Sequence, residues 1–105
     1  MGSAAARRSV TIAIRAPLRR EDLPGLYRRT CALLRAGPAP ALLLCDVRGI
    51  AADGVAIDAL ARLALAARRA GACVRLLGAS PELRGLVGLA GLARVLPADP
   101  VVRGR

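Results

Sequence analysis

The stretch Cys45–Arg69, CDVRGIAADGVAIDALARLALAARR, decides the fold of this 105-residue chain. It starts at the end of a short apolar run over residues 41–47, which is typical of a central strand buried on both faces. A tight loop at 49–54 follows, and the helical spacing of apolar residues then continues to about residue 70. In an α/β fold, ligands and partners usually bind outside the carboxyl end of a strand, which is where this loop lies.

Similar patterns lie on both sides of this unit. Alternating residues over 9–15 predict a first strand, and apolar residues at three-four spacing predict a helix that ends at Gly37-Pro38. Residues 73–77 predict a third strand, Ser80-Pro81-Glu82 predicts a helix start, and residues 92–96 predict a short fourth strand.

We therefore predict a single α/β domain over residues 9–97. It has a mostly parallel or mixed four-stranded sheet, with strands at about 9–15, 41–47, 73–77 and 92–96, and three to four helices. Residues 1–8 are predicted to be a disordered or cloning-derived tail, and residues 98–105 a disordered C-terminal tail.

The composition argues against several classes of function. The chain carries 17 arginines, no lysine, no histidine and 7 acidic residues, for a formal net charge of +10. Such a charge suits a phosphate-rich partner, but the arginines are scattered, and Ala, Gly and Leu are enriched with them, so nucleic-acid binding is only an alternative. A single aromatic residue, Tyr27, also argues against base stacking. No apolar run reaches the roughly 18 residues of a membrane span, so we expect a cytoplasmic protein.

No constellation of catalytic or metal-binding residues stands out. The loop at 49–54 precedes a helix, as a phosphate-binding loop does, but it lacks the Gly-Lys-Ser/Thr ending. Cys31, Cys45 and Cys73 have no zinc-like spacing, and without a histidine no imidazole can activate them. The two aspartates that bound the loop are explained as a strand-end carboxylate and a helix cap. We therefore expect no enzymatic activity, no metal and no cofactor.

These elements together resemble the STAS domain family, which includes anti-sigma-factor antagonists and the cytoplasmic tails of sulfate transporters. The strand ending in Asp46 is similar to the family's V-x-L-D, and Gly54 with its helix is similar to G-x-x-x-L-x-x-L. Residues 68–76 resemble the family's basic helix end, glycine and next strand, and residues 80–92 resemble its S-P-E-(V/L)…(T/S)-G-L segment. The resemblance covers about residues 10–96, and the loop and helix look like an Arg-rich actinobacterial branch.

The resemblance places Asp53 at the family's phosphorylation switch. The family motif is Asp-Ser-Ser/Thr-Gly, whereas this chain has Ala-Ala-Asp-Gly at 51–54, so both hydroxyls are missing. Asp53 stands at the phospho-acceptor position. It either mimics a phosphorylated residue, with about one negative charge instead of the roughly 1.5 to 2 of a phosphate, or serves only as a helix cap.

The resemblance implies a non-enzymatic protein–protein interaction module. The residues expected to contact a partner are Ile50, Ala52, Asp53 and Gly54 in the loop, with Arg62 and Arg69 on the following helix as weaker candidates. The first expectation is a regulator similar to an anti-sigma-factor antagonist, which binds an anti-sigma kinase. The alternatives are an accessory STAS subunit bound to the ATPase of a lipid-transport ABC system, and an Arg-rich nucleic-acid-binding domain. A homodimer is left open.

Overall fold

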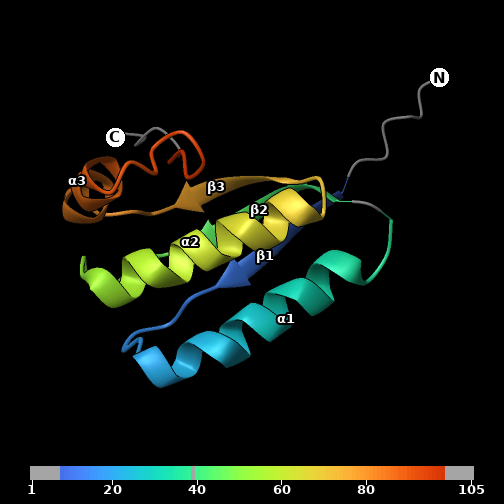
Figure 1. The fold of residues 1–105 in the computed structure, drawn as a ribbon, viewed down its shortest axis with the longest axis horizontal. Helices are drawn as coiled ribbons and strands as arrows, with labels where there is room; N and C mark the ends of the chain where they lie inside the picture. Colours follow the sequence, from blue (N-terminus) through green and yellow to red (C-terminus); the bar gives the residue numbers. More distant parts are fainter. Residues whose placement is uncertain (1–7, 39, 99–105) are drawn as a thin grey trace.

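The computed structural model describes residues 8–38 and 40–98, and it contains one parallel sheet with its helices (Figure 1). The elements in chain order are β1 (Arg8–Ala13), the one-turn 3₁₀ helix η2 (Arg20–Asp22), α1 (Leu23–Arg35), β2 (Pro40–Asp46), α2 (Gly54–Arg69), β3 (Cys73–Leu77) and α3 (Pro81–Leu89). The three strands are parallel to one another and lie in the order β1-β2-β3.

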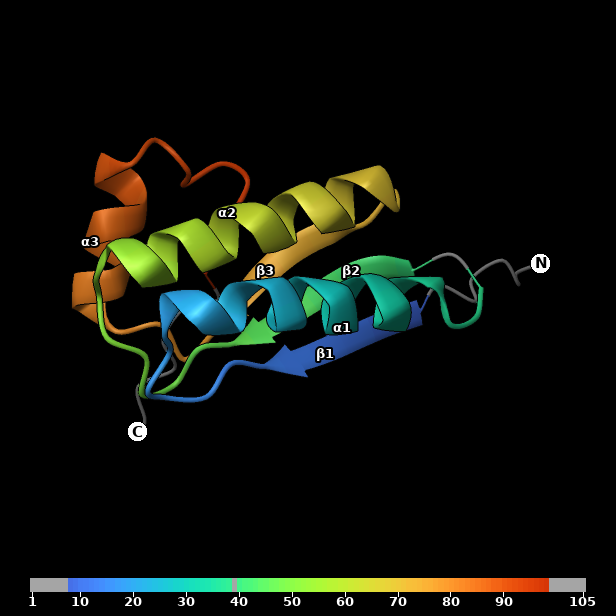
Figure 2. The ribbon, with the colours of Figure 1, turned by 60° about the horizontal axis from the view of Figure 1, so that its bottom comes forward.

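The helices α1 and α2 cover the same face of this sheet. The crossover from β1 to β2 and the crossover from β2 to β3 step in the same direction across the sheet. Because such crossovers are right-handed, both helices come to lie on one side. Figure 2 shows α1 and α2 side by side over the strands, and the two helices contact each other.

The core lies between this face of the sheet and the two helices. The register aligns two rows of side chains across the three strands, each 6% exposed or less: Val10, Leu43 and Val74, then Ile12, Cys45 and Leu76. On α2, the residues buried against them are Ala56, Ala59, Leu60, Leu63, Ala66 and Ala67. Burial of this apolar area is the main stabilising term, at roughly 25 cal/mol per Å².

Three of the predicted strands are present, but the strand predicted at residues 92–96 is wrong. That segment forms a turn, in which the Leu96 N–H donates to the Leu92 carbonyl oxygen at 2.9 Å. Gly91, with φ of 76°, reverses the chain directly after α3, and Leu96, at 2% exposure, anchors the turn on the core. Residues 92–95, between Gly91 and Leu96, therefore form the turn and do not pair with the sheet.

The chain meets the outer side of β3 only after this turn. The Leu76 N–H donates to the Pro97 carbonyl oxygen at 2.9 Å, and Leu76 forms an isolated parallel bridge with Ala98. Ala98 therefore contacts the sheet, although it was predicted to begin the C-terminal tail. Likewise β1 starts at Arg8, which was predicted to end the N-terminal tail. The other tail residues, 1–7 and 99–105, lie outside the described residues.

Candidate functional site

The loop between β2 and α2 begins at a fixed ion pair. The carboxylate of Asp46, the last residue of β2, accepts Nε of Arg48 at 2.9 Å and Nη2 at 2.6 Å. It also accepts the backbone N–H of Arg48 at 3.2 Å. These hydrogen bonds lower the pKa of Asp46 from 3.8 to about 2. Asp46 is thus a permanently ionised carboxylate at neutral pH that holds the first turn of the loop.

The middle of the loop turns into the core at Ile50. Gly49 has φ of 82°, in the left-handed region that glycine adopts readily. The Ile50 N–H donates to the Val47 carbonyl oxygen at 3.1 Å, and the Val47 N–H donates to the Leu77 carbonyl oxygen at 3.0 Å. The Ile50 side chain is 6% exposed, so it anchors the loop and offers a partner little surface.

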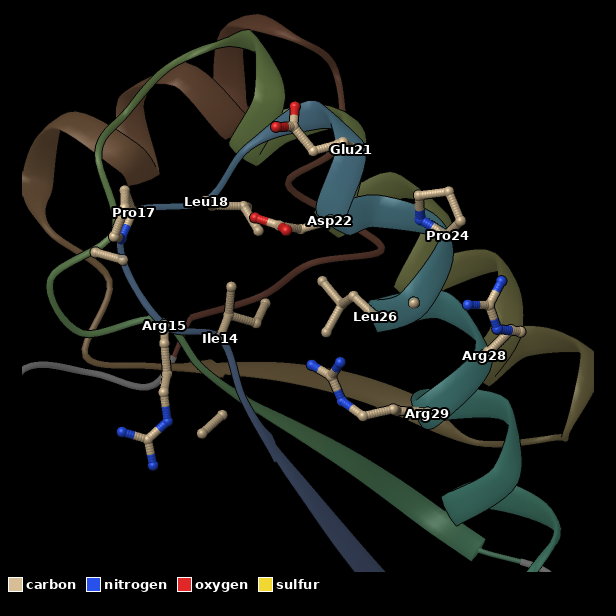
Figure 3. Close-up of a pocket in the computed structure, with 13 residues that line it drawn as sticks. Ile14, Arg15, Pro17, Leu18, Glu21, Asp22, Pro24, Leu26, Arg28 and Arg29 are labelled. Atoms are coloured by element: carbon tan, nitrogen blue, oxygen red, sulfur yellow. The ribbon is translucent and has the colours of Figure 1, made fainter.

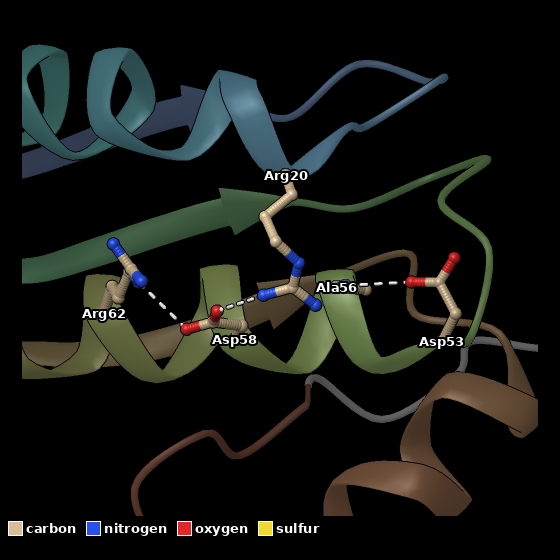
Figure 4. Close-up of polar contacts among 5 residues, drawn as sticks. All are labelled: Arg20, Asp53, Ala56, Asp58 and Arg62. Carbon is tan, nitrogen blue, oxygen red and sulfur yellow. Dashed lines mark hydrogen bonds and ion pairs between the residues drawn. The ribbon is translucent and has the colours of Figure 1, made fainter.

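The helix α2 begins at Asp53, and the predicted helix cap is confirmed. Asp53 has extended backbone, with φ of −143° and ψ of 179°, and its Oδ1 accepts the Ala56 N–H at 2.9 Å. In Figure 4 the second carboxylate oxygen points away from this hydrogen bond. The negative charge therefore lies at the positive end of the helix dipole and remains open to solvent.

Residues 51–54 form an exposed strip between the anchor at Ile50 and the body of α2. All four, Ala51, Ala52, Asp53 and Gly54, are exposed. A Cβ added to Gly54 meets no atom of the described residues within 4 Å, and φ at Gly54 is not positive. The fold therefore does not require a glycine at this position.

Asp58, one turn into α2, ties this helix to the segment before α1. Its carboxylate oxygens accept Nη1 of Arg20 at 2.8 Å and Nε of Arg62 at 2.9 Å (Figure 4). The hydrogen bond from Arg62, with the charges of both arginines, lowers the pKa of Asp58. The spacing of four residues along a helix predicts the contact with Arg62, whereas the contact with Arg20 spans 38 residues and has no local signal.

The two arginines expected as weaker partner contacts lie at the middle and at the end of α2. Arg62 is paired with Asp58 in the middle of the helix, and its side chain is 48% exposed. Arg69 lies 15 residues beyond Gly54, about 22 Å along the helix axis. Its Nη1 donates to the Tyr27 hydroxyl of α1 at 3.3 Å. The structure thus brings Ala52, Asp53 and Gly54 together at the start of α2, places Arg62 in the middle of the helix, about 12 Å along its axis, and places Arg69 at its far end.

The carboxylates around this loop already accept hydrogen bonds: Asp46 and Asp58 accept them from arginines, and Asp53 accepts one from the first turn of α2. In residues 8–38 and 40–98, no group of three or more His, Cys, Asp or Glu side chains is placed to hold a metal ion. Within the same residues, no helix has the length and hydropathy to cross a membrane. Burial raises the pKa of the Cys45 thiol to about 12, so this thiol stays protonated in the core.

Comparisons with protein-family models, with curated proteins and with solved structures find no match for this chain. The function is therefore inferred from the geometry of the loop and from the motifs around Asp46, Gly54 and Ser80. Two of these motif residues have defined roles in the structure. Asp46 fixes the start of the loop, and the Ser80 Oγ caps α3 by accepting the Leu83 N–H at 3.0 Å.

Proposed function

We propose that this chain is a non-enzymatic, STAS-like protein–protein interaction module that docks through residues 50–54 and the start of α2. It acts in the cytoplasm as a regulator similar to an anti-sigma-factor antagonist, with Asp53 in place of the usual phospho-acceptor. The observation that carries the proposal is the exposed strip 51–54, held between a buried anchor and a capped helix. Such a preorganised segment loses little conformational entropy when a partner binds.

Gly54 gives independent support to this docking role. The fold leaves open space where its side chain would be, and a glycine in a first helical turn costs stability relative to alanine. The missing Cβ at Gly54 leaves room for a partner's backbone to approach closely beside the exposed residues 51–53.

Asp53 supplies the only charge of the strip. One of its oxygens accepts the Ala56 N–H, and the carboxylate remains exposed. It therefore presents a fixed negative charge where the family presents a hydroxyl that gains a phosphate. On this proposal, docking does not depend on phosphorylation of residue 53.

A photo-crosslinking amino acid placed at residue 52 tests the proposal in the cells that make this protein. We expect an adduct with an anti-sigma kinase, identified by mass spectrometry. The matched control carries the same amino acid at Leu89 of α3, a side chain that is 88% exposed. An adduct with a lipid-transport ATPase assigns the domain to the transporter alternative. No protein adduct specific to residue 52 contradicts the proposal.

A further inference from the structure

Among residues 8–38 and 40–98, β1 is an edge strand of the sheet. Within the described residues β1 pairs only with β2, and the Ile14 N–H donates to the Asp46 carbonyl oxygen at 3.0 Å. Because successive residues of a strand point their N–H and C=O groups to opposite sides, those of Thr11 and Ala13 point to the free edge. Figure 2 shows α1 over one face of the sheet, near β1. The edge is thus a row of backbone groups available to another strand.

Two hollows flank this edge near its carboxyl end. One, of about 720 Å³, opens between residues 13–18 and the start of α1 (Figure 3). The other, of about 440 Å³, lies against residues 13–16 and Asp46. Cys45 is buried in the core under α1 and α2. Because neighbouring residues of a strand point to opposite faces, the side chain of Asp46 lies on the face away from these helices. Of β1 itself, only its last residue, Ala13, lines the two hollows, so they can receive side chains from the end of an added strand that extends past Ala13.

The charges at the two hollows favour an acidic segment. Three arginines line them and form no ion pair with a described carboxylate within 4 Å: Arg15, whose charge acts on Asp46 from a greater distance, Arg28 and Arg29. Arg15 borders both hollows, and in Figure 3 the side chain of Arg29 extends from α1 toward the end of β1. Glu21 and Asp22 also line the larger hollow, and the pair Asp46 and Arg48 lines the smaller one. Over both hollows four guanidinium groups stand against three carboxylates, in a chain with net charge +10.

We propose that the free edge of β1 is a second docking site, which takes an extended acidic segment of a partner protein as an added strand. The backbone of the segment pairs with Thr11 and Ala13, as in other cases of strand addition, and its acidic side chains lie at Arg15 and Arg29. A second copy of this chain fits less well. Two antiparallel β1 strands related by a two-fold axis bring the Arg8 end of one copy against the Arg15 end of the other.

The test measures binding of the fluorescein-labelled peptide Glu-Val-Glu-Thr-Glu-Val-Glu-Thr by fluorescence anisotropy. We expect this peptide to bind and the same peptide with Lys in place of Glu not to bind. Arg29→Glu is expected to weaken binding by about tenfold or more, the effect of about 1.4 kcal/mol. The control Arg84→Glu makes the same change of charge on α3, away from the edge, and is expected to change the affinity by less than about twofold. Equal losses in the two variants overturn the proposal, because they indicate unspecific charge attraction.

Ala13→Pro tests the backbone pairing. It removes an N–H that points to the free edge and leaves the hydrogen bonds to β2 in place, since proline is tolerated at such edge positions. We expect it to abolish peptide binding with an unchanged far-UV circular dichroism spectrum. If this variant does not fold, the same backbone pairing is tested by N-methylating alternate residues of the peptide, which removes the N–H groups of the peptide. An unchanged affinity of the methylated peptide overturns the proposal. A dimer in sedimentation that the peptide does not dissociate also overturns it, because the edge then belongs to a second copy.

Discussion

Replacing Asp53 with alanine removes the cap of α2 and lowers the free energy of unfolding. The hydrogen bond that is lost joins Oδ1 to the Ala56 N–H at 2.9 Å. Replacing an N-cap Asp with Ala costs about 1 kcal/mol, within a range of roughly 0.5–2. In a domain of this size, a loss of about 1 kcal/mol lowers Tm by about 4–8 °C.

Asp53→Asn and Asp53→Ser separate the cap from the charge. Both keep a side-chain oxygen that can accept the Ala56 N–H, and both residues rank with Asp as N-caps. They lose only the interaction of the carboxylate with the helix dipole, about 0.3–1 kcal/mol at low ionic strength. Because salt screens this interaction, the two variants approach the wild-type stability at high salt, whereas Asp53→Ala does not.

Urea unfolding followed by far-UV circular dichroism, at low and at high salt, measures these differences. At high salt we expect the Asn and Ser variants to be nearly as stable as wild type and the Ala variant to be less stable than all three. If the Asn variant remains as unstable as the Ala variant at high salt, the cap hydrogen bond is not what stabilises α2. If the Ala variant is as stable as wild type, the cap contributes nothing and the local account of this helix start is wrong.

The same variants distinguish the two roles of Asp53 in docking. We expect Asp53→Asn to weaken partner binding although it folds normally, because the exposed carboxylate is the only charge on residues 51–54. Asp53→Ser is expected to accept phosphate from a cognate anti-sigma kinase and ATP, read as a mass increase at residue 53. Wild-type affinity in the Asn variant together with no phosphorylation of the Ser variant assigns Asp53 to capping alone.

Two further predictions concern the ionisable groups near the sheet. As the pH falls from about 4 to about 2, protonation of Asp46 lowers the free energy of unfolding. Its pKa is 3.8 when free and about 2 when bonded to Arg48, so protonation breaks these hydrogen bonds in the folded chain. Urea unfolding over this range shows a smaller pH dependence for Asp46→Asn, and an equal dependence in both proteins contradicts the assignment. Iodoacetamide at neutral pH modifies the exposed Cys73 first, whereas Cys45, buried and with a pKa of about 12, reacts only on unfolding; early modification of Cys45 by mass spectrometry contradicts its burial.

The parts of the fold that depend on local signals are predictable from the sequence. Asp53 and Ser80 are each an N-cap residue placed directly before an apolar helical pattern, and both cap a helix in the structure. Residues 73–77 form the strand that their apolar alternation predicts. Residues 92–96 have a similar apolar pattern but form a turn, because Gly91 has a positive φ and the Leu92 N–H donates to the Val87 carbonyl oxygen at 3.0 Å, which ends α3 and reverses the chain.

The parts of the site that depend on distant contacts are not predictable in this way. The pairing of Arg20 with Asp58 follows from how α1 and α2 pack, which no spacing in the sequence encodes. For the same reason no sequence pattern indicates that Arg69, expected as a weaker partner contact on α2, donates to Tyr27 of α1. An apolar residue in a loop can face a partner or the core, and for Ile50 only the structure shows that it faces the core.

Gly54→Ala tests whether residues 51–54 are the docking surface that we propose. The matched control is Gly85→Ala in α3, where a Cβ likewise meets no described atom within 4 Å and φ is not positive. Both substitutions are expected to keep the free energy of unfolding or raise it by up to about 1 kcal/mol. The measurement is the dissociation constant for the partner that crosslinks from residue 52, determined by isothermal titration calorimetry. We expect Gly54→Ala to weaken this binding by about tenfold or more and Gly85→Ala to leave it unchanged. Wild-type affinity in the Gly54→Ala protein shows that residues 51–54 are not the docking surface.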